Sequence, residues 1–425
     1  MKQLSCAIAA ALLAAALPGA ARASQLTTLY QFTGGTDGAT PYKGPTIDAT
    51  GTLYGVAYDG ANACPDSYSF AGVGCGTTWK LAGGTLTPLL TFLGSSNGAT
   101  PFGNLIVVGS KLYGTTYAGG APDQGTVFEV TTGGTGYRRL HTFVGTDGAQ
   151  PDSTIRADSA GNGYSVAPYG GPAFAGSGTG FGVLYEISHT GTFIPLHDFS
   201  GGTDGGTPGR IYLDGNGNIF GAAAIGGACT GSGVPAAGCG VVYEYTIVSG
   251  QFQVLYTFTG GSDGYGPGLA GIDSAGNLIG YTDLSGADGY GSLFKLTKGT
   301  GGYTYSNLWN FTGGADGAYP EAPPALLSGS GDRMIGTTFE GPVNGTNVGA
   351  GTLWEYANGR VTNLYTFSGG SDGGYPQGTP VLDSSGNIYD TTSYGGIAPC
   401  NTAGGTLIST YGCGTVFKYG SAPAE

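Results

Sequence analysis

Charged side chains are scarce in this 425-residue chain: only 10% of its residues are Asp, Glu, Lys or Arg, and only three are histidines. The 14 basic residues are scattered and are outnumbered by 27 acidic ones, which gives a formal net charge of −13. A nucleic-acid partner requires a clustered basic surface, and a polybasic membrane anchor requires the same. The sequence therefore excludes both kinds of partner.

Helical periodicity and long apolar runs are also missing beyond the N-terminus. No segment repeats apolar residues every 3.6 positions, and no apolar run is long enough to span a bilayer. The chain also lacks a Gly-x-Ser-x-Gly elbow, a His-rich metal motif and a phosphate-binding loop. We therefore expect no helices of consequence, no membrane span and no cofactor, and a catalytic role is the less favoured hypothesis.

The first 23 residues have the features of a cleaved targeting segment. Lys2 supplies a positive charge, Ala7–Leu17 is an apolar run, and Ala-Arg-Ala at 21–23 is a small-x-small cleavage site. We predict cleavage after Ala23 and export to the periplasm or the extracellular space. Residues 24–425 are then expected to form one domain.

Six cysteines remain after this segment, and they fall into three close pairs. Metal sites favour spacings of two to four residues with histidine nearby, whereas these pairs are wider and have no neighbouring histidine. An even number of cysteines in an exported chain indicates disulfides. The predicted local pairs are Cys64–Cys75, Cys229–Cys239 and Cys400–Cys413.

Glycine is abundant, with 88 copies beside 22 prolines, and much of it belongs to one recurring phrase. The phrase begins with Phe, passes through a Gly-rich turn and ends in Pro, as in FTGGTDGATP at Phe32–Pro41. Such long periods are typical of propellers and solenoids. The seven copies begin at Phe32, Phe92, Phe143, Phe199, Phe258, Phe311 and Phe367.

Each repeat contains four short strands linked by hairpins, which is the composition of a propeller blade. The two ends of the chain are complementary: Leu26–Phe32 copies the strand that ends each blade, and Gly414–Tyr419 copies the strand before it. Joining them closes the ring and leaves no open sheet edge. We predict an all-β fold, a seven-bladed β-propeller whose last blade is completed by the N-terminal strand.

Phrases like LYTF, GGxDGxxP, DxxGNLYG and GTVFKL recur along the chain and resemble those of the choice-of-anchor tandem-repeat proteins called GloVer. The resemblance covers Leu26 to Tyr419. It implies a secreted bacterial protein of a family without an established activity, so it supplies no site residues.

An aspartate recurs in the turn of nearly every repeat, and Asn97 replaces it in the second copy. A ring of carboxylates around a channel would suit Ca²⁺ or acid catalysis. The favoured interpretation is structural, because Asp and Asn both cap their own turns. The calcium candidates, should the ring bind metal, are Asp37, Asp147, Asp204, Asp263, Asp316 and Asp372.

Aromatic residues recur at the start of the long loops, which should share one face of the ring. Exposed aromatic side chains suit sugar stacking or protein contact; the alternative is that they fill space between blades. The candidates for the ligand face are Tyr58, Tyr117, Tyr169, Phe339 and Tyr394.

The leading hypothesis for function is a secreted, non-catalytic, monomeric module that binds an unknown glycan or extracellular protein through its long-loop face. The alternative is a secreted carbohydrate-active hydrolase or lyase with acidic residues near the channel mouth. A passive surface or matrix component is a third hypothesis. Catalysis predicts two close carboxylates with divergent pKa values in one pocket, and binding does not.

Overall fold

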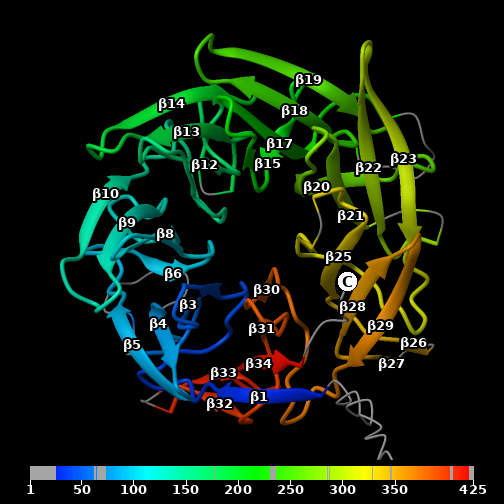
Figure 1. The fold of residues 1–425 in the computed structure, drawn as a ribbon. Coiled ribbons are helices and arrows are strands. Elements are labelled where there is room, and N and C mark those ends of the chain that lie inside the picture. The colour runs from blue at the N-terminus through cyan, green and yellow to red at the C-terminus, as the bar shows by residue number, and fades with distance from the viewer. Residues whose placement is uncertain are drawn as a thin grey trace, which may run out of the picture.

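Seven small antiparallel sheets are arranged around a central axis, so the chain is a seven-bladed β-propeller (Figure 1). The computed structural model describes residues 25–61, 64, 73–176, 178–229, 236–284, 286, 288–327, 329–344, 347–402 and 405–420. Within these ranges there is no helix. The predicted targeting segment lies outside the described residues.

The blades follow one another in chain order, each running from an inner to an outer strand. Blade 1 contains β2 (Thr46–Ile47), β3 (Leu53–Ala57), β4 (Thr77–Ala82) and β5 (Thr85–Thr91); blade 2 contains β6 (Ala99–Pro101), β7 (Ile106–Val108), β8 (Lys111–Ala118), β9 (Thr126–Thr131) and β10 (Arg138–Thr142). Blade 3 contains β11 (Arg156–Ala157), β12 (Gly163–Ala167), β13 (Val183–Ile187) and β14 (Phe193–Asp198); blade 4 contains β15 (Gly206–Pro208), β16 (Tyr212–Leu213), β17 (Asn218–Ile225), β18 (Val241–Thr246) and β19 (Gln251–Thr257).

The remaining three blades have the same order of strands, and two short hairpins project from them. Blade 5 contains β20 (Tyr265–Ile272), β21 (Leu278–Leu284), β22 (Ser292–Gly299) and β23 (Gly302–Asn310); blade 6 contains β24 (Ala325–Leu326), β25 (Arg333–Thr338), β28 (Thr352–Ala357) and β29 (Arg360–Thr366). Blade 7 contains β30 (Val381–Leu382), β31 (Ile388–Thr392), β34 (Thr415–Tyr419) and β1 (Leu26–Gln31). The hairpins are β26 (Val343–Asn344) with β27 (Asn347–Val348) and β32 (Cys400–Asn401) with β33 (Leu407–Ser409).

Blade 7 is built from both ends of the chain. Strand β1, blue in Figure 1, pairs antiparallel with the red strand β34, and the register runs from Leu26 opposite Tyr419 to Gln31 opposite Thr415. The first strand is therefore the outermost strand of the last blade, as the complementary ends of the sequence predicted. This pairing leaves no blade unfinished.

Large aromatic rings fill each blade, and glycine makes room for them. The ring of Trp79 on β4 lies over Gly55 on β3, where an added Cβ would come within 2.3 Å of it. Phe294 lies over Gly280 in blade 5 in the same way. Phe32, the first residue of the repeated phrase, packs edge-on against Trp79 and is fully buried. The aromatic and glycine positions of the repeat thus form one packing unit per blade.

Proline and glycine join neighbouring blades in a ring of seven matching contacts. The Cδ of Pro41 lies 2.5 Å from where a Cβ on Gly414 would stand, so only glycine fits there. Gly414 also has a φ of +90°, a backbone conformation that residues other than glycine rarely adopt. The other contacts join Gly76 with Pro101, Gly125 with Pro151, Gly182 with Pro208, Gly240 with Pro267, Gly291 with Pro320 and Gly351 with Pro376.

The residue before each of these prolines is left-handed, and six of the seven are not glycine. Thr40 has a φ of 49° and Thr207 a φ of 48°, although β-branched residues rarely adopt positive φ. In return, the amide N–H of Thr40 donates a hydrogen bond of 2.8 Å to the carbonyl of Cys413, and that of Thr207 one of 2.9 Å to the carbonyl of Phe181. This conformation therefore ties each blade to the one before it.

The three predicted disulfides are present, each within its own loop. The Cα atoms are 5.0 Å apart in Cys64–Cys75, 5.3 Å in Cys229–Cys239 and 4.9 Å in Cys400–Cys413. Closing short loops in this way limits the freedom of the unfolded chain. In the part of the chain that the structure describes, no helix is long and apolar enough to cross a membrane.

Candidate functional site

The six turn aspartates make their hydrogen bonds locally. The Asp263 carboxylate accepts from the Tyr256 hydroxyl at 3.1 Å, and from the backbone N–H and hydroxyl of Thr259 at 2.9 and 2.7 Å. In the second repeat, Asn97 takes the same place and its Oδ1 accepts from the N–H of Leu93 at 2.6 Å. Asp37, Asp147, Asp204, Asp316 and Asp372 each accept from their own turn and from the residue two before the repeat Phe.

Two of these donors are histidines, which accounts for their position in the sequence. His141 is 2.9 Å from Asp147, and His197 is 3.2 Å from Asp204. The His141 ring also stacks on Phe193, with centroids 3.8 Å apart. The histidines therefore take the place that tyrosine or tryptophan has in other blades. Across the described residues, no three His, Cys, Asp or Glu side chains come together closely enough to hold a metal ion.

A different set of side chains lines the central channel. They come chiefly from the residues that follow each repeat proline, where the seven copies diverge. Together they enclose a cavity of about 160 Å³, which we term the channel pocket. It is lined by Lys43, Asn104, Asp152, Ser153, Thr154, Gly209, Arg210, Tyr281, Glu321, Pro323, Gln377 and Thr379.

A chain of hydrogen-bonded side chains, which we term the bar, crosses the channel at one end of this pocket. Arg210 of blade 4 donates to the Thr379 hydroxyl on the far side of the ring at 2.6 Å and to the Thr154 hydroxyl at 3.3 Å. Thr154 in turn donates to Asn104 at 3.1 Å, and Asn104 donates to the Gly44 carbonyl at 2.6 Å. These residues also line a second cavity in the channel, beside Arg156 and Tyr212. The bar therefore separates the two cavities.

The charges around the channel pocket influence one another but are not paired. Lys43 and Arg210 carry positive charge, and Asp152 and Glu321 carry carboxyl groups, yet none of these described side chains has an opposite charge within 4 Å. Burial lowers the pKa of Lys43, against the opposing charge of Asp152, and burial likewise raises the pKa of Asp152. Unpaired charges facing a cavity are available to a ligand.

Asp283 adds a third carboxyl group to this set. It lies at the end of β21, and its Oδ1 is buried without a hydrogen-bond partner. Burial, followed by the charge of Glu321, raises the pKa of Asp283 to about 7, although Lys43 opposes this. Burial also raises the pKa of Glu321, whose Oε2 accepts from Gln377 at 2.5 Å. Two carboxyl groups with raised pKa values therefore lie near Lys43, and the charge of Glu321 acts on Asp283.

One further carboxylate lies directly behind the channel wall. Asp390 on β31 is fully buried, and it takes the position that is Gly55 in blade 1 and Gly280 in blade 5. Its Oδ1 accepts from the N–H of Thr391 at 2.8 Å, but its Oδ2 has no partner. Burial raises its pKa well above the usual range. This carboxyl group destabilises the folded chain whenever it is ionised.

A band of aromatic side chains, the aromatic arc, lies beside the pocket. Phe102 joins the two, because the Lys43 ammonium lies 4.5 Å from its ring centroid. Tyr58 and Phe102 meet edge to face at 5.5 Å, and the hydroxyls of Tyr42 and Tyr394 are 3.4 Å apart. The arc consists of Phe339, Tyr375, Tyr394, Tyr42, Tyr58, Phe102 and Tyr117, all of them half-buried.

The five predicted ligand-face aromatics occupy related positions. Tyr58, Tyr117, Phe339 and Tyr394 belong to the aromatic arc. Tyr169 follows Tyr117 in the next blade, close enough to contribute to the raised pKa of Tyr117, which burial brings to about 12. These rings do contact neighbours, as the space-filling interpretation requires, but they also keep part of their surface exposed.

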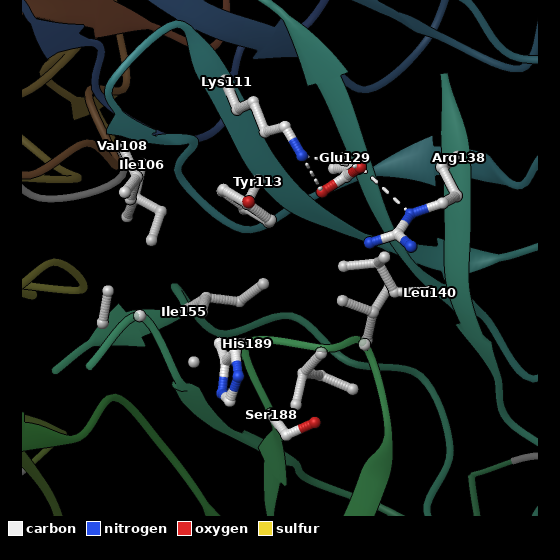
Figure 2. A pocket seen from close by; sticks show the side chains of 16 residues that line it. Ile106, Val108, Lys111, Tyr113, Glu129, Arg138, Leu140, Ile155, Ser188 and His189 are labelled. Carbon is white, nitrogen blue, oxygen red and sulfur yellow. Dashed lines mark hydrogen bonds and ion pairs between the residues drawn. The ribbon is translucent and has the colours of Figure 1, made fainter. Parts of the chain in front are cut away.

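A third cavity, of about 60 Å³, lies between blades 2 and 3, outside the channel, and we term it the blade groove. Figure 2 shows Lys111 and Arg138 converging on Glu129 above Ile155 and Leu140, with His189 opposite. Lys111 is 3.1 Å and Arg138 is 3.0 Å from the Glu129 carboxylate. Both cations of the groove therefore share one carboxylate, whereas the described cations of the channel pocket have none within 4 Å.

Sequence reasoning missed the channel pocket because it searched for what the repeats share. The informative signal was instead a difference between the repeats. After the repeated proline come Tyr42-Lys43, Asp152, Gly209-Arg210, Glu321 and Gln377. Four scarce charges of both signs thus fall at the first or second position after the proline. Divergence at one point of an otherwise regular repeat marks a surface built for something other than the fold.

The sequence model of the Gloeobacter/Verrucomicrobia repeat matches residues 20–234 and again residues 228–423. This confirms the resemblance drawn from the repeated phrases. No curated protein matches the chain.

Solved structures with similar folds include several enzymes. A luciferin-regenerating enzyme is 12% identical over 94% of this chain and 95% of its own, with a TM-score of 0.41. An oxidoreductase described as a glucose dehydrogenase from Thermus thermophilus is 12% identical over 93% and 99%, with a TM-score of 0.43. A gluconolactonase from Xanthomonas campestris is 14% identical over 80% and 90%, with a TM-score of 0.42. Scores this low carry no argument about activity.

Proposed function

This chain belongs to the Gloeobacter/Verrucomicrobia repeat family, and we propose that it is an exported propeller that binds a glycan at the channel mouth without transforming it. The observation that carries the proposal is the aromatic arc beside a pocket of unpaired polar groups. The three disulfides and the N-terminal targeting pattern support export.

Sugars suit this combination because each ring has both apolar and polar surfaces. The C–H faces of a sugar ring stack on half-exposed aromatic rings such as Tyr58 and Phe102. Its hydroxyls donate to carboxylates such as Asp152 and Glu321, in charge-assisted hydrogen bonds. A protein ligand would need a broader contact surface than one pocket and its rim provide.

The proposal is tested with a glycan array and the mature protein, residues 24–425, followed by calorimetric titration of each hit. Tyr42→Ala and Tyr394→Ala should each weaken binding up to about tenfold, because a specific aromatic contact contributes about 0.5–1.5 kcal/mol. The matched control is Tyr303→Ala on the outer strand β23, which should leave binding unchanged. Absence of any glycan hit, or equal losses in all three variants, contradicts the proposal.

A second function, a carbohydrate-active hydrolase or lyase, is favoured by one observation. Asp283 has a pKa raised to about 7 and interacts with Glu321, so it can hold a proton near neutral pH as a general acid does. Under this hypothesis the purified protein releases shorter products from the bound glycan, detected by chromatography. Asp283→Asn would then abolish release but retain binding. An intact glycan after prolonged incubation eliminates this second function.

A further inference from the structure

We infer that the bound glycan ends in a sugar that carries a carboxylate, held by Arg210 and Lys43 in the channel pocket. The inference rests on the proposed function and specifies its ligand. Three observations support it: neither cation has a carboxylate partner among the described residues, carboxyl groups surround both cations, and the bar closes the pocket.

Arg210 is a fixed cation without a counterion. A guanidinium has five N–H donors, and here two hydrogen bonds lead only to neutral hydroxyls, those of Thr379 and Thr154. Its Nε is buried and has no partner in the described chain. The chain contains 27 acidic residues, yet none of those described lies within 4 Å of this arginine. A guanidinium held in this way matches a planar carboxylate.

Lys43 supplies the second positive charge on the same pocket. Its ammonium rests over Phe102 at 4.5 Å rather than on a carboxylate. Burial lowers its pKa, and so does the nearby charge of Arg210. An anion bound between the two cations would relieve their mutual repulsion. The aromatic arc would then hold the sugar ring to which the anion is attached.

The surrounding carboxyl groups favour a small monoanion. Asp152, Asp283 and Glu321 act electrostatically on Lys43 from around the pocket. A phosphate carries about −1.5 to −2 charges near neutral pH, so these groups repel it more strongly than a carboxylate. Their own oxygens accept hydrogen bonds from sugar hydroxyls. The pocket therefore selects a uronic-acid type of sugar rather than a phosphorylated one.

The bar formed by Arg210, Thr379, Thr154 and Asn104 makes the pocket blind. A polymer cannot thread through the channel past these hydrogen bonds. The ligand must therefore present an end, and the carboxylate belongs to the terminal sugar.

The test is calorimetric titration with three matched oligosaccharides: one with a terminal hexuronate, its carboxyl-reduced neutral analogue and its phosphorylated analogue. We expect the hexuronate to bind at least tenfold more tightly than the other two. Arg210→Met and Lys43→Met should each erase this preference while retaining affinity for the neutral analogue. Arg139→Met, at an exposed arginine on β10, is the matched control and should change nothing.

Each result leads to a decision. Equal affinity for the hexuronate and the neutral analogue overturns the inference and leaves the proposed function intact. A preference for the phosphorylated sugar also overturns it. If none of the three oligosaccharides binds and the array shows no other hit, the proposed function fails and the inference with it. Should Arg210→Met fail to fold, Lys43→Met alone decides, because Lys43 has no part in the bar.

Discussion

The blade groove and the channel pocket contain similar kinds of residues in opposite arrangements. In the groove, Glu129 lies between Lys111 and Arg138, 3.1 Å from the first and 3.0 Å from the second, so both cations have a carboxylate partner. In the pocket, Lys43 and Arg210 face a cavity without a carboxylate within bonding distance. The ion pairs of the groove lie within blade 2 and stabilise it, whereas charges left without a partner cost stability and are expected where a protein binds a ligand.

This comparison predicts that substitutions of acidic residues have opposite signs in the two regions. Around the channel they should stabilise the folded chain, because they remove unpaired charge. In the blade groove and in the turns they should destabilise it, because they remove bonds.

The largest expected effect is at Asp390, behind the channel wall. Asp390→Gly should raise the free energy of unfolding by about 2 kcal/mol at neutral pH, since it removes a buried carboxylate with an unpaired oxygen. Burial raises the folded-state pKa above the unfolded value, so the penalty grows as pH rises and the gain should shrink near pH 4. Chemical denaturation at both pH values measures it. Ser165→Gly, the uncharged equivalent in blade 3, should show no pH dependence; the same dependence there contradicts the explanation.

The next largest effect is a loss of stability on substitution of Glu129 in the blade groove. Glu129→Gln should lower the free energy of unfolding by about 1–2 kcal/mol, because both ion pairs disappear. Despite desolvation by burial, the hydrogen bond from Lys111 and the charge of Arg138 keep the pKa of Glu129 below its usual range. Its contribution is therefore present above the unfolded pKa and lost as pH falls. Thermal melts between about pH 3 and pH 7 check this, and glycan affinity should not change.

A smaller gain in stability is expected when Asp283 is replaced. Its pKa of about 7 exceeds the ordinary value of 3.8, so ionisation removes stability as pH rises between these values. Asp283→Asn should stabilise the chain by about 1 kcal/mol above pH 7 and by nearly nothing near pH 4, because solvent in the channel screens the charge. A melting temperature that falls at neutral pH would show that the carboxylate has a favourable partner after all.

The smallest effect is expected in a turn. Asp263→Asn should cost less than about 0.5 kcal/mol, because the amide oxygen still accepts the turn hydrogen bonds, as Asn97 does in the second repeat. Asp263→Ala should cost about 1 kcal/mol. If the turn bound Ca²⁺, a chelator would lower the melting temperature of the wild type and Asn would be as harmful as Ala.

The sequence predicted the fold further than it predicted the site, and the reason is physical. Within every blade except blade 7, the strands pair over less than about 60 residues, with contacts such as Trp79 on Gly55 that recur with the repeat. The channel pocket depends on side chains from different blades, such as Lys43, Arg210 and Glu321, which only ring closure brings together. No spacing in the sequence encodes that encounter. The turn aspartates were the first candidates because they repeat, but their carboxylates accept hydrogen bonds from their own turns and from the preceding strand.

The pairing of β1 with β34 also determines the order in which the molecule is completed. Strand β1 leaves the ribosome among the first and must wait for its partner, which is the last strand to be synthesised. Until then blade 7 lacks its outer strand, and Pro41 lacks the glycine against which it packs. Long-range pairing of this kind is slow to form, and an unpaired edge invites association with other chains. Closure of the ring therefore requires synthesis to continue at least through β34: a chain interrupted before Tyr419 stays open at the seam.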